Sequence, residues 1–532
     1  MRNPLFIIIL LFSSLLHAQA LVFERNSDIE DFGLILNNRQ FTKFQNEGLF
    51  LRDSALLNFN RDINYTFKDY FSYESLEITD SVKLKRSIAL INYKSGKSRL
   101  IVNPLLNASV SNYGEGRLST NSRGLVLRSN LFDKFNIEAS VLENQRFLTR
   151  KDYNYSIENG VVPGLGFWKN YDSTGADYFL AQGAIYSNLY KRNRDLVHFS
   201  FGNFSQKFGM GIRSLYLGGN TPASMGMRLH TIIGGRVRYT NYFSQLNGFS
   251  ALLGNTLLPK KFIAAHRLGL VLGKKENFEI GLFEGVIHSR QGGAGGFDLD
   301  YLNPIIFYRS VESNLGSADN SLVGIDLTYR TRFGDLYSQF VLDEFKKSEI
   351  LKSWWANKYA LQLGYMHTHE LKSNYGHVAR VEMNVVKPYT YGHYNPLNNY
   401  AHYNQALAHP YGANFRELIL KYTGLFPKLS NIWLTVNAMV LRQGIDSSAT
   451  AVNWGGDIRR SNDTRPFDYG VKMLQGKRND ILSLSISLNK MIWHKFSANI
   501  TYEYRSETRY VISNNYISLG LLYHLSPANP IL

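Results

Sequence analysis

The sequence predicts an all-β chain whose strands close into a transmembrane antiparallel β-barrel of about 16–20 strands, with about 18 as the best estimate. Three observations lead to this fold class: an export signal at the N-terminus, long strands of alternating polarity, and one such strand almost at the C-terminus. A large soluble β-sandwich remains an alternative, because the solvated face of a soluble sheet produces the same alternation.

The first 20 residues have the three parts of a secretory signal peptide. Arg2 supplies the positive charge, residues 5–16 form a short apolar stretch, and Ala18 and Ala20 form an A-x-A cleavage site. A membrane-spanning helix needs about 20 apolar residues, so this stretch is too short to be an anchor. We therefore expect an exported protein of the Gram-negative outer membrane.

The composition limits the partners of such a protein. Lys and Arg total 59 against 42 Asp and Glu, which gives a formal net charge of +17. An exported protein meets no cytoplasmic nucleic acid, so the basic excess indicates outer-membrane lipid and an acidic or neutral surface exopolysaccharide as partners. The absence of cysteine excludes disulfides, thiolate metal sites and a cysteine nucleophile. We expect a monomer without cofactor or metal.

Alternation of polar and apolar residues predicts the strands. In residues 481–490, Leu482, Leu484, Ile486 and Leu488 alternate with serine and asparagine. Similar runs occupy residues 135–141, 323–330, 379–385, 432–440, 495–505 and 516–525. The longest reach about ten residues, the length of a tilted membrane strand and more than globular sheets usually show. The last run lies where pairing with the first strand would remove both sheet edges.

We predict three regions along the chain: the signal peptide at 1–20, a periplasmic segment or plug at 21–98, and the barrel at 99–532. Residues 21–98 are rich in charge and alternate only in places. The long connections of such barrels face the cell exterior. The candidates are residues 151–175, 209–226, 290–320, 389–415 and 446–479.

Residues 389–415 form the most distinctive of these connections, with six tyrosines interleaved with amides. Aromatic faces stack on sugar rings, and amides donate to and accept from hydroxyl groups, so the composition suits glycan binding. The alternative is an aromatic girdle with a packed loop. The candidate glycan-binding residues are Tyr389, Tyr391, Tyr394, Asn395, Tyr400, Tyr403 and Asn404, with Trp454 and the same-face pair Asp298 and Asp300 outside the segment.

Basic and imidazole side chains suggest two further sites. Four arginines are predicted to line the lumen and attract acidic sugar or phosphate, namely Arg236, Arg238, Arg330 and Arg380. The alternative is that they pair with Asp326, Asp335 and Glu382. His367 and His369 share one strand face, as metal ligands do, but no carboxylate pattern accompanies them, so polar strand positions are the expected explanation.

Five segments together resemble a known family. They are DLDYLNPIIFYRSVE at 298–312, the glycine-containing stretch at 315–326, YSQFVLDEF at 337–345, residues 402–417 and NWGGD at 453–457. They resemble the capsule-assembly Wzi-like outer-membrane family, and within it the gliding-motility RemB-type proteins of Bacteroidota. The resemblance implies a barrel of about 18 strands with a periplasmic N-terminal part. It also implies a lectin-like, non-enzymatic role, and for the RemB-type branch a link to gliding and its machinery proteins.

The leading hypothesis is a non-enzymatic barrel that binds or organises surface polysaccharide, serving capsule or exopolysaccharide attachment and gliding motility. A channel for oligosaccharides or anions is the alternative, because a basic lumen would suit it. An outer-membrane hydrolase is the third hypothesis, and only the histidine-rich segment with scattered serines and aspartates favours it.

Overall fold

The computed structural model describes residues 91–523 apart from 114–115, 133, 249–257, 304–306, 309–316, 318, 351, 373–374, 427–431, 449–450 and 494–495. The predicted signal peptide and nearly all of the predicted 21–98 segment lie outside the described residues. Of that segment, the structure describes β1 (Ile91–Ser95) and the turn that leads into β2.

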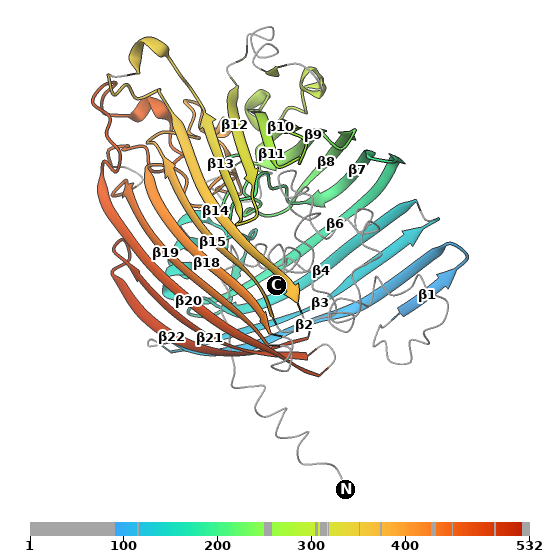
Figure 1. The fold of residues 1–532 in the computed structure, drawn as a ribbon. Coiled ribbons are helices and arrows are strands. Elements are labelled where there is room, and N and C mark those ends of the chain that lie inside the picture. Colours follow the sequence, from blue (N-terminus) through green and yellow to red (C-terminus); the bar gives the residue numbers. More distant parts are fainter. Residues whose placement is uncertain are drawn as a thin grey trace.

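Twenty strands join in one sheet, and the 18 that remain without the short strands β1 and β5 (Lys169–Asn170) close into an antiparallel barrel (Figure 1). The last strand pairs with the first, from Leu106 opposite Tyr523 to Tyr113 opposite Tyr516, so closure is as predicted. The barrel strands are β2 (Ser98–Tyr113), β3 (Gly116–Leu131), β4 (Phe135–Phe147), β6 (Gly175–Arg192), β7 (Asp195–Phe204), β8 (Ser224–Ile233), β9 (Val237–Asn247), β10 (Lys260–Leu272), β11 (Phe278–His288), β12 (Asn320–Arg330), β13 (Asp335–Leu342), β14 (Tyr359–Lys372), β15 (Tyr375–Val386), β18 (Phe415–Phe426), β19 (Ile432–Ile445), β20 (Lys477–Trp493), β21 (Phe496–Glu507) and β22 (Ile512–Tyr523).

The two ends of the barrel differ in the length of their connections. Short turns, such as 331–334 between β12 and β13, join the strands at one end, which we call the turn end. Long loops emerge from the other end, the loop end, at 148–174, 205–223, 289–319, 343–358, 387–414 and 446–476. In outer-membrane barrels the long loops face the cell exterior. These loops coincide with the predicted long connections, and 343–358 is an addition.

The loops contain the few remaining elements. Loop 148–174 carries the helix α5 (Arg150–Asn159), which begins at the capping side chain of Thr149 and ends at Gly160. Loop 387–414 carries the hairpin of β16 (Ala401–His402) and β17 (Gln405–Ala406). None of the described helices is long and apolar enough to cross a membrane. Short 3-10 turns are η3 (Gln291–Gly293), η4 (Leu299–Leu302), η5 (Lys347–Glu349), η6 (Pro396–Asn398) and η8 (Asn462–Thr464).

Each strand presents a polar face to the lumen and an apolar face to the outside, because side chains alternate with a period of two. On β15, Arg380 and Glu382 are buried inside the barrel, whereas Val381 and Met383 are exposed on its outer wall. The exposed apolar rows are the surface that a lipid bilayer covers.

Loop 205–223, the lumen loop, folds into the barrel. The backbone nitrogens of Ile212 and Arg213 donate to the Glu382 carboxylate over 2.6 and 3.0 Å, and that of Leu215 donates to the Gln339 side chain over 2.8 Å. Glu382 and Gln339 belong to the inner faces of β15 and β13. The largest cluster of buried apolar side chains includes lumen-loop residues, so much of the core lies inside the barrel.

Candidate functional site

Loop 387–414 connects the other loops at the loop end. The Tyr391 hydroxyl donates to the Leu215 carbonyl of the lumen loop over 2.8 Å. The Asn404 amide donates to the Asn159 carbonyl at the end of α5, also over 2.8 Å. The backbone nitrogen of Asn462 donates to a carbonyl of loop 387–414 over 3.3 Å. These contacts join four loops into one cap, and they use the Asn404 side chain as a structural link.

Three of the predicted glycan-binding tyrosines lie in the interior of this cap. Tyr389 is 2 % exposed, and Tyr391 and Tyr400 are 0 % exposed. The Tyr389 hydroxyl donates to the Asn453 carbonyl over 2.8 Å, and burial raises the pKa of Tyr389 to about 12. A ring without exposed surface cannot stack on a sugar. We therefore correct the sequence-based assignment: these three side chains support the cap.

The other residues predicted in this segment lie nearer the surface. Tyr394 is 49 % exposed. The Asn395 side chain accepts from the backbone nitrogen of Leu397 over 3.1 Å and so caps η6. Tyr403 is half-buried and meets Phe167 edge to face, with ring centroids 5.0 Å apart. Of these residues, Tyr394 presents the most open ring to a ligand.

The predicted pair Asp298 and Asp300 does not lie on a strand. Asp298 caps η4 by accepting from the backbone nitrogen of Asp300 over 3.2 Å, and it forms an ion pair with Arg290 at 3.0 Å. The expectation that the two carboxylates share a strand face is therefore wrong, because the segment turns into a 3-10 helix. Asp300 remains exposed, whereas Asp298 is engaged within the loop.

Two of the four arginines predicted to line the lumen share one acidic partner. Arg238 and Arg330 bind the Glu279 carboxylate at 3.0 and 3.1 Å. Arg380 donates to a backbone carbonyl of the lumen loop over 2.9 Å. Arg236 lies in the exposed turn between β8 and β9, away from the lumen. Three of the four arginines thus hold the barrel interior together, and the fourth is corrected to a surface position at the turn end.

The histidine pair lies on the outer wall at the turn end of β14. The rings of His367 and His369 lie 5.4 and 5.5 Å from that of His377 on β15. Among the residues that the structure describes, no group of three or more His, Asp or Glu side chains could hold a metal ion. The described chain therefore offers no support for a metal centre here.

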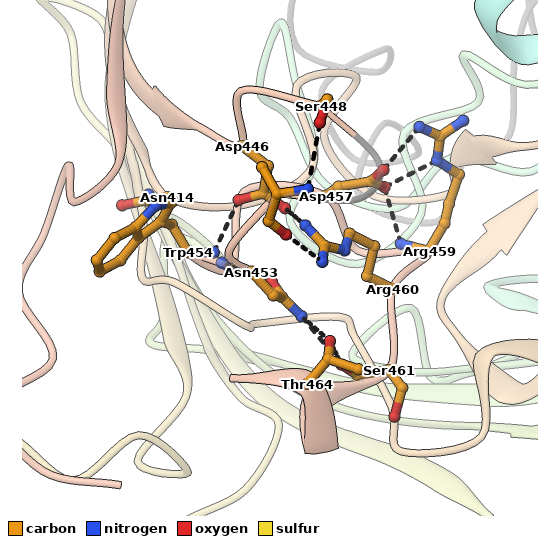
Figure 2. A network of polar contacts seen from close by, with 12 residues as sticks. Asn414, Asp446, Ser448, Asn453, Trp454, Asp457, Arg459, Arg460, Ser461 and Thr464 are labelled. Atoms are coloured by element: carbon orange, nitrogen blue, oxygen red, sulfur yellow. Dashed lines mark hydrogen bonds and ion pairs between the residues drawn. The ribbon is translucent and has the colours of Figure 1, made fainter. Parts of the chain in front are cut away.

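The NWGGD segment forms a braced turn in loop 446–476 (Figure 2). The backbone nitrogen of Trp454 donates to one oxygen of Asp446 over 2.8 Å, and Arg460 binds the other at 2.8 Å. The Asn453 side chain accepts from the backbone nitrogen of Gly455 over 2.9 Å. Burial raises the pKa of the Asp446 carboxyl, although the bonds from Trp454 and Arg460 act in the opposite direction. The turn fixes where the Trp454 ring lies.

A second ion-paired arginine, Arg459, connects this turn to α5 through a hydrogen bond. The Arg459 guanidinium binds the Asp457 carboxylate with two hydrogen bonds of 2.8 and 2.7 Å (Figure 2). It also donates to the side chain of Asn159. Burial acts to lower the pKa of Arg459, but the adjacent Asp457 carboxylate outweighs it and the pKa is raised. Loop 446–476 is therefore anchored on two sides.

The sequence analysis missed most of an aromatic surface that this turn supports. Its members are Trp354 and Trp355 from loop 343–358, and Trp454, Phe467 and Tyr469 from loop 446–476. The backbones of the two loops run side by side, since the nitrogen of Trp355 donates to the Asp468 carbonyl over 2.9 Å. The adjacent tryptophans at 354–355 and the aromatic spacing at 467–469 are the sequence signals that could have identified it.

Two rings of the aromatic surface are exposed and the three tryptophans are half-buried, with an arginine beside one of them. Phe467 is 39 % and Tyr469 53 % exposed. The Arg465 guanidinium lies 3.9 Å from the centre of the Trp355 ring, and Trp454 meets Phe467 edge to face at 6.0 Å. Exposed rings such as Phe467 and Tyr469, with hydrogen-bond donors nearby, are what sugar rings and their hydroxyl or carboxylate groups require.

Comparison with known proteins identifies the family. The family model for the capsule assembly protein Wzi matches residues 196–515, which is more than half of the chain. The chain belongs to the Wzi capsule assembly family. With the closed barrel, membership places it in the outer membrane of a Gram-negative cell.

The barrel resembles solved outer-membrane proteins. Wzi of Escherichia coli, described as an outer membrane protein involved in group 1 capsule assembly and a carbohydrate-binding β-barrel, has a TM-score of 0.52 at 13 % identity, with 96 % of this chain and 99 % of that chain covered. OprD of Pseudomonas aeruginosa has a TM-score of 0.42 at 11 % identity, covering 80 % and 94 % of the two chains. OccAB2 of Acinetobacter baumannii has a TM-score of 0.41 at 10 % identity, covering 81 % and 99 %. No curated protein sequence gives a significant match. At these identities the likeness concerns the fold.

Proposed function

We propose that this protein is a non-enzymatic barrel that binds surface polysaccharide at its loop end and thereby attaches capsule or exopolysaccharide to the cell. The aromatic surface is the single observation that carries the proposal. Its five rings lie on loops that face the cell exterior in barrels of this kind. Membership of the Wzi family and the carbohydrate binding described for Wzi of Escherichia coli support it.

The rigidity of the aromatic surface supports binding. Ordering a flexible loop on association costs free energy, so rings that are already fixed retain more of their stacking energy. Trp454 is held by the braced NWGGD turn, and Trp355 by its backbone bond to Asp468 and by Arg465. A preorganised platform of this kind suits repeated weak contacts along a polymer.

The lumen contacts give no support to the alternative of a channel. The lumen loop is bonded to inner-face residues of β13 and β15, and the lumen arginines Arg238 and Arg330 are paired with Glu279. A conducting lumen needs open, hydrated space lined by charge that is available to the solute. In the described interior, these groups instead bind other parts of the same chain.

We extend the proposal to gliding motility through the RemB-type resemblance of the sequence. A barrel that holds polysaccharide at the surface would couple the cell to the slime on which gliding cells move. Colony spreading of a deletion strain tests this extension separately. Normal spreading together with lost polysaccharide would remove gliding and retain attachment.

The experiment for the main proposal measures where the polysaccharide resides. Cells that lack the gene are complemented with wild-type protein or with the triple variant Trp354→Ala, Phe467→Ala and Tyr469→Ala. We expect the deletion and the triple variant to release polysaccharide into the medium, and the wild type to keep it on the cells. The control Tyr171→Ala removes an exposed ring from another loop. Attachment by the triple variant at the wild-type level would contradict the proposal.

A further inference from the structure

Part of loop 289–319 folds back over the outside of the barrel wall. We call its described residues 297–303 and 307–308 the strap. Phe297 contacts the rings of Phe262 and His288 at 5.6 and 5.0 Å, and Tyr301 stacks on His288 at 4.7 Å. Tyr301 and Tyr308 are both fully buried. The strap therefore covers β9, β10 and β11 on the side opposite the lumen loop.

Beneath the strap, three polar side chains stand in one row on this outer face. Asn241, His266 and Glu284 are direct cross-strand partners on β9, β10 and β11. The same row continues to Leu229 on β8 and to Val323 on β12, which is exposed on the outer wall. Cross-strand partners share a face, so the polar row points away from the lumen and toward the side that lipid covers.

Some of the polar atoms in this row are engaged. The His266 ring contacts the Glu284 carboxylate at 3.2 Å, and the backbone nitrogen of Tyr308 donates to the same carboxylate over 2.8 Å. The Tyr308 ring lies 4.5 Å from that of His266. The strap is thus attached to the wall through Glu284.

Other atoms of the same cluster lack a partner among the residues that the structure describes. The Asn241 Oδ1, the His266 Nδ1 and the Tyr308 hydroxyl are buried, and none of them makes a hydrogen bond with a residue that the structure describes. Asn241 is 3 %, His266 8 % and Tyr308 0 % exposed. Each buried polar atom left unpaired costs about 1–3 kcal/mol, so a bound group that supplied the missing partners would stabilise this cluster.

We propose that the polar row and the strap form a site for the sugar headgroup of an outer-leaflet glycolipid. A sugar hydroxyl both donates and accepts, and therefore satisfies the amide oxygen, the imidazole nitrogen and the phenol alike. Exposed Leu282 and Val323 border the row, where acyl chains would lie. This site is separate from the aromatic surface and does not depend on the proposed function.

The location of the row selects a glycolipid over a free sugar. A soluble oligosaccharide would have to enter from the bilayer side, where the outer wall is apolar, whereas a membrane glycolipid diffuses along that wall. The strap descends from the loop end, which corresponds to the outer leaflet. Its exposed Leu299, Leu302 and Phe307 provide further apolar contact with that leaflet.

The test measures lipid binding by native mass spectrometry of the full protein in detergent. The probes are a lipid A-type glycolipid with a diglucosamine headgroup and, as a sugar-free anionic lipid, phosphatidylglycerol. We expect saturable binding of the glycolipid and weaker binding of phosphatidylglycerol. The double variant Asn241→Leu and Tyr308→Phe should lower glycolipid affinity about tenfold or more, because it removes two hydrogen-bonding groups.

Matched controls keep the result interpretable. Tyr301→Phe removes a strap hydroxyl that already has a partner, Asp319 at 2.7 Å, and should keep the glycolipid affinity near the wild-type value. Tyr308→Phe alone removes one hydroxyl group, and it replaces the double variant in the binding test if the double variant does not fold. Equal binding of the two lipids, or wild-type affinity in a folded double variant, would overturn the site. Polysaccharide binding should persist in these variants, so failure here is distinguishable from failure of the proposed function.

Discussion

Gly455 lies directly against the backbone of Tyr389. A Cβ atom added to Gly455 would approach the Tyr389 nitrogen to 2.6 Å, and the backbone of Gly455 has a φ of +78°. The same nitrogen donates to the Gly455 carbonyl over 3.0 Å. The NWGGD turn and loop 387–414 therefore meet backbone to backbone, at a distance that only glycine permits. This contact helps to position Trp454 beside the rest of the aromatic surface.

We predict that Gly455→Ala disrupts the cap and leaves the barrel intact. The clash and the positive φ together should cost more than about 1 kcal/mol, enough to move the NWGGD turn. The expected results are faster proteolytic cleavage within 446–476 and weaker polysaccharide binding. Heat-modifiable migration on gels, which reports the closed barrel, should not change.

Gly470→Ala is the matched control for this variant. Gly470 lies in the same loop with a φ of +79°, but a Cβ there meets no atom within 4 Å. It therefore carries the conformational strain without the clash. If Gly470→Ala impaired the cap as much as Gly455→Ala, the close approach to Tyr389 would not be the cause.

We predict that Glu382→Ala releases the lumen loop. The substitution leaves the backbone donors of Ile212 and Arg213 buried without their acceptor, at about 1–3 kcal/mol each. In planar bilayers the wild type should conduct little, and the variant should show larger and more frequent conductance steps. Glu158→Ala, which removes an exposed carboxylate at the loop end, should behave as wild type. Large wild-type conductance would instead revive the channel alternative.

We predict a pH-dependent contribution to stability from Asp343 in loop 343–358. Burial raises the pKa of its carboxyl from 3.8 to about 6, although the Lys358 ammonium at 3.2 Å acts to lower it. The folded protein therefore favours the protonated acid. This contribution is complete below about pH 3.8 and is lost as the pH rises through about 6, with a limit of about 3 kcal/mol.

Asp343→Asn tests this contribution, because asparagine stays neutral. The substitution also removes the ion pair with Lys358, which shifts the unfolding temperature of the variant. The test therefore concerns how the temperature difference from wild type changes with pH. The apparent unfolding temperature of the variant should rise relative to wild type between about pH 4 and pH 7. Glu344→Gln removes the neighbouring carboxylate, which also contacts Lys358. A temperature difference for Asp343→Asn that stays constant across this pH range would contradict the assignment.

The barrel itself could be predicted from the sequence because its signal is local. The run at 481–490 lies within β20, and the final run pairs with the first barrel strand as expected. Alternation with a period of two is present in each strand alone and needs no knowledge of its neighbours. The approximate strand number followed from the length of chain available.

The site could not be predicted to the same extent, because burial in the cap depends on distant segments. Tyr391 is covered by contacts such as that with Leu215, far away in the sequence. From composition alone, residues 389–415 therefore resemble an open sugar-binding loop. Trp354 and Phe467 become neighbours of one surface only when two loops pair.

The polar row on the outer wall shows the same limit. His266 and Glu284 interrupt the apolar pattern expected of a lipid-facing surface. The sequence alone therefore does not reveal which face of β10 and β11 lies outside. Only the position of the strap explains why polar residues are tolerated there.

The most direct test of the account is binding of the cell's own purified surface polysaccharide to the detergent-solubilised protein, measured over a salt series. The account predicts saturable binding that salt weakens, and at least about a tenfold loss of affinity in the triple variant Trp354→Ala, Phe467→Ala and Tyr469→Ala. Tyr171→Ala should bind as wild type does. No binding by the wild type at any salt concentration, or equal binding by the triple variant, would contradict the aromatic surface as the polysaccharide site.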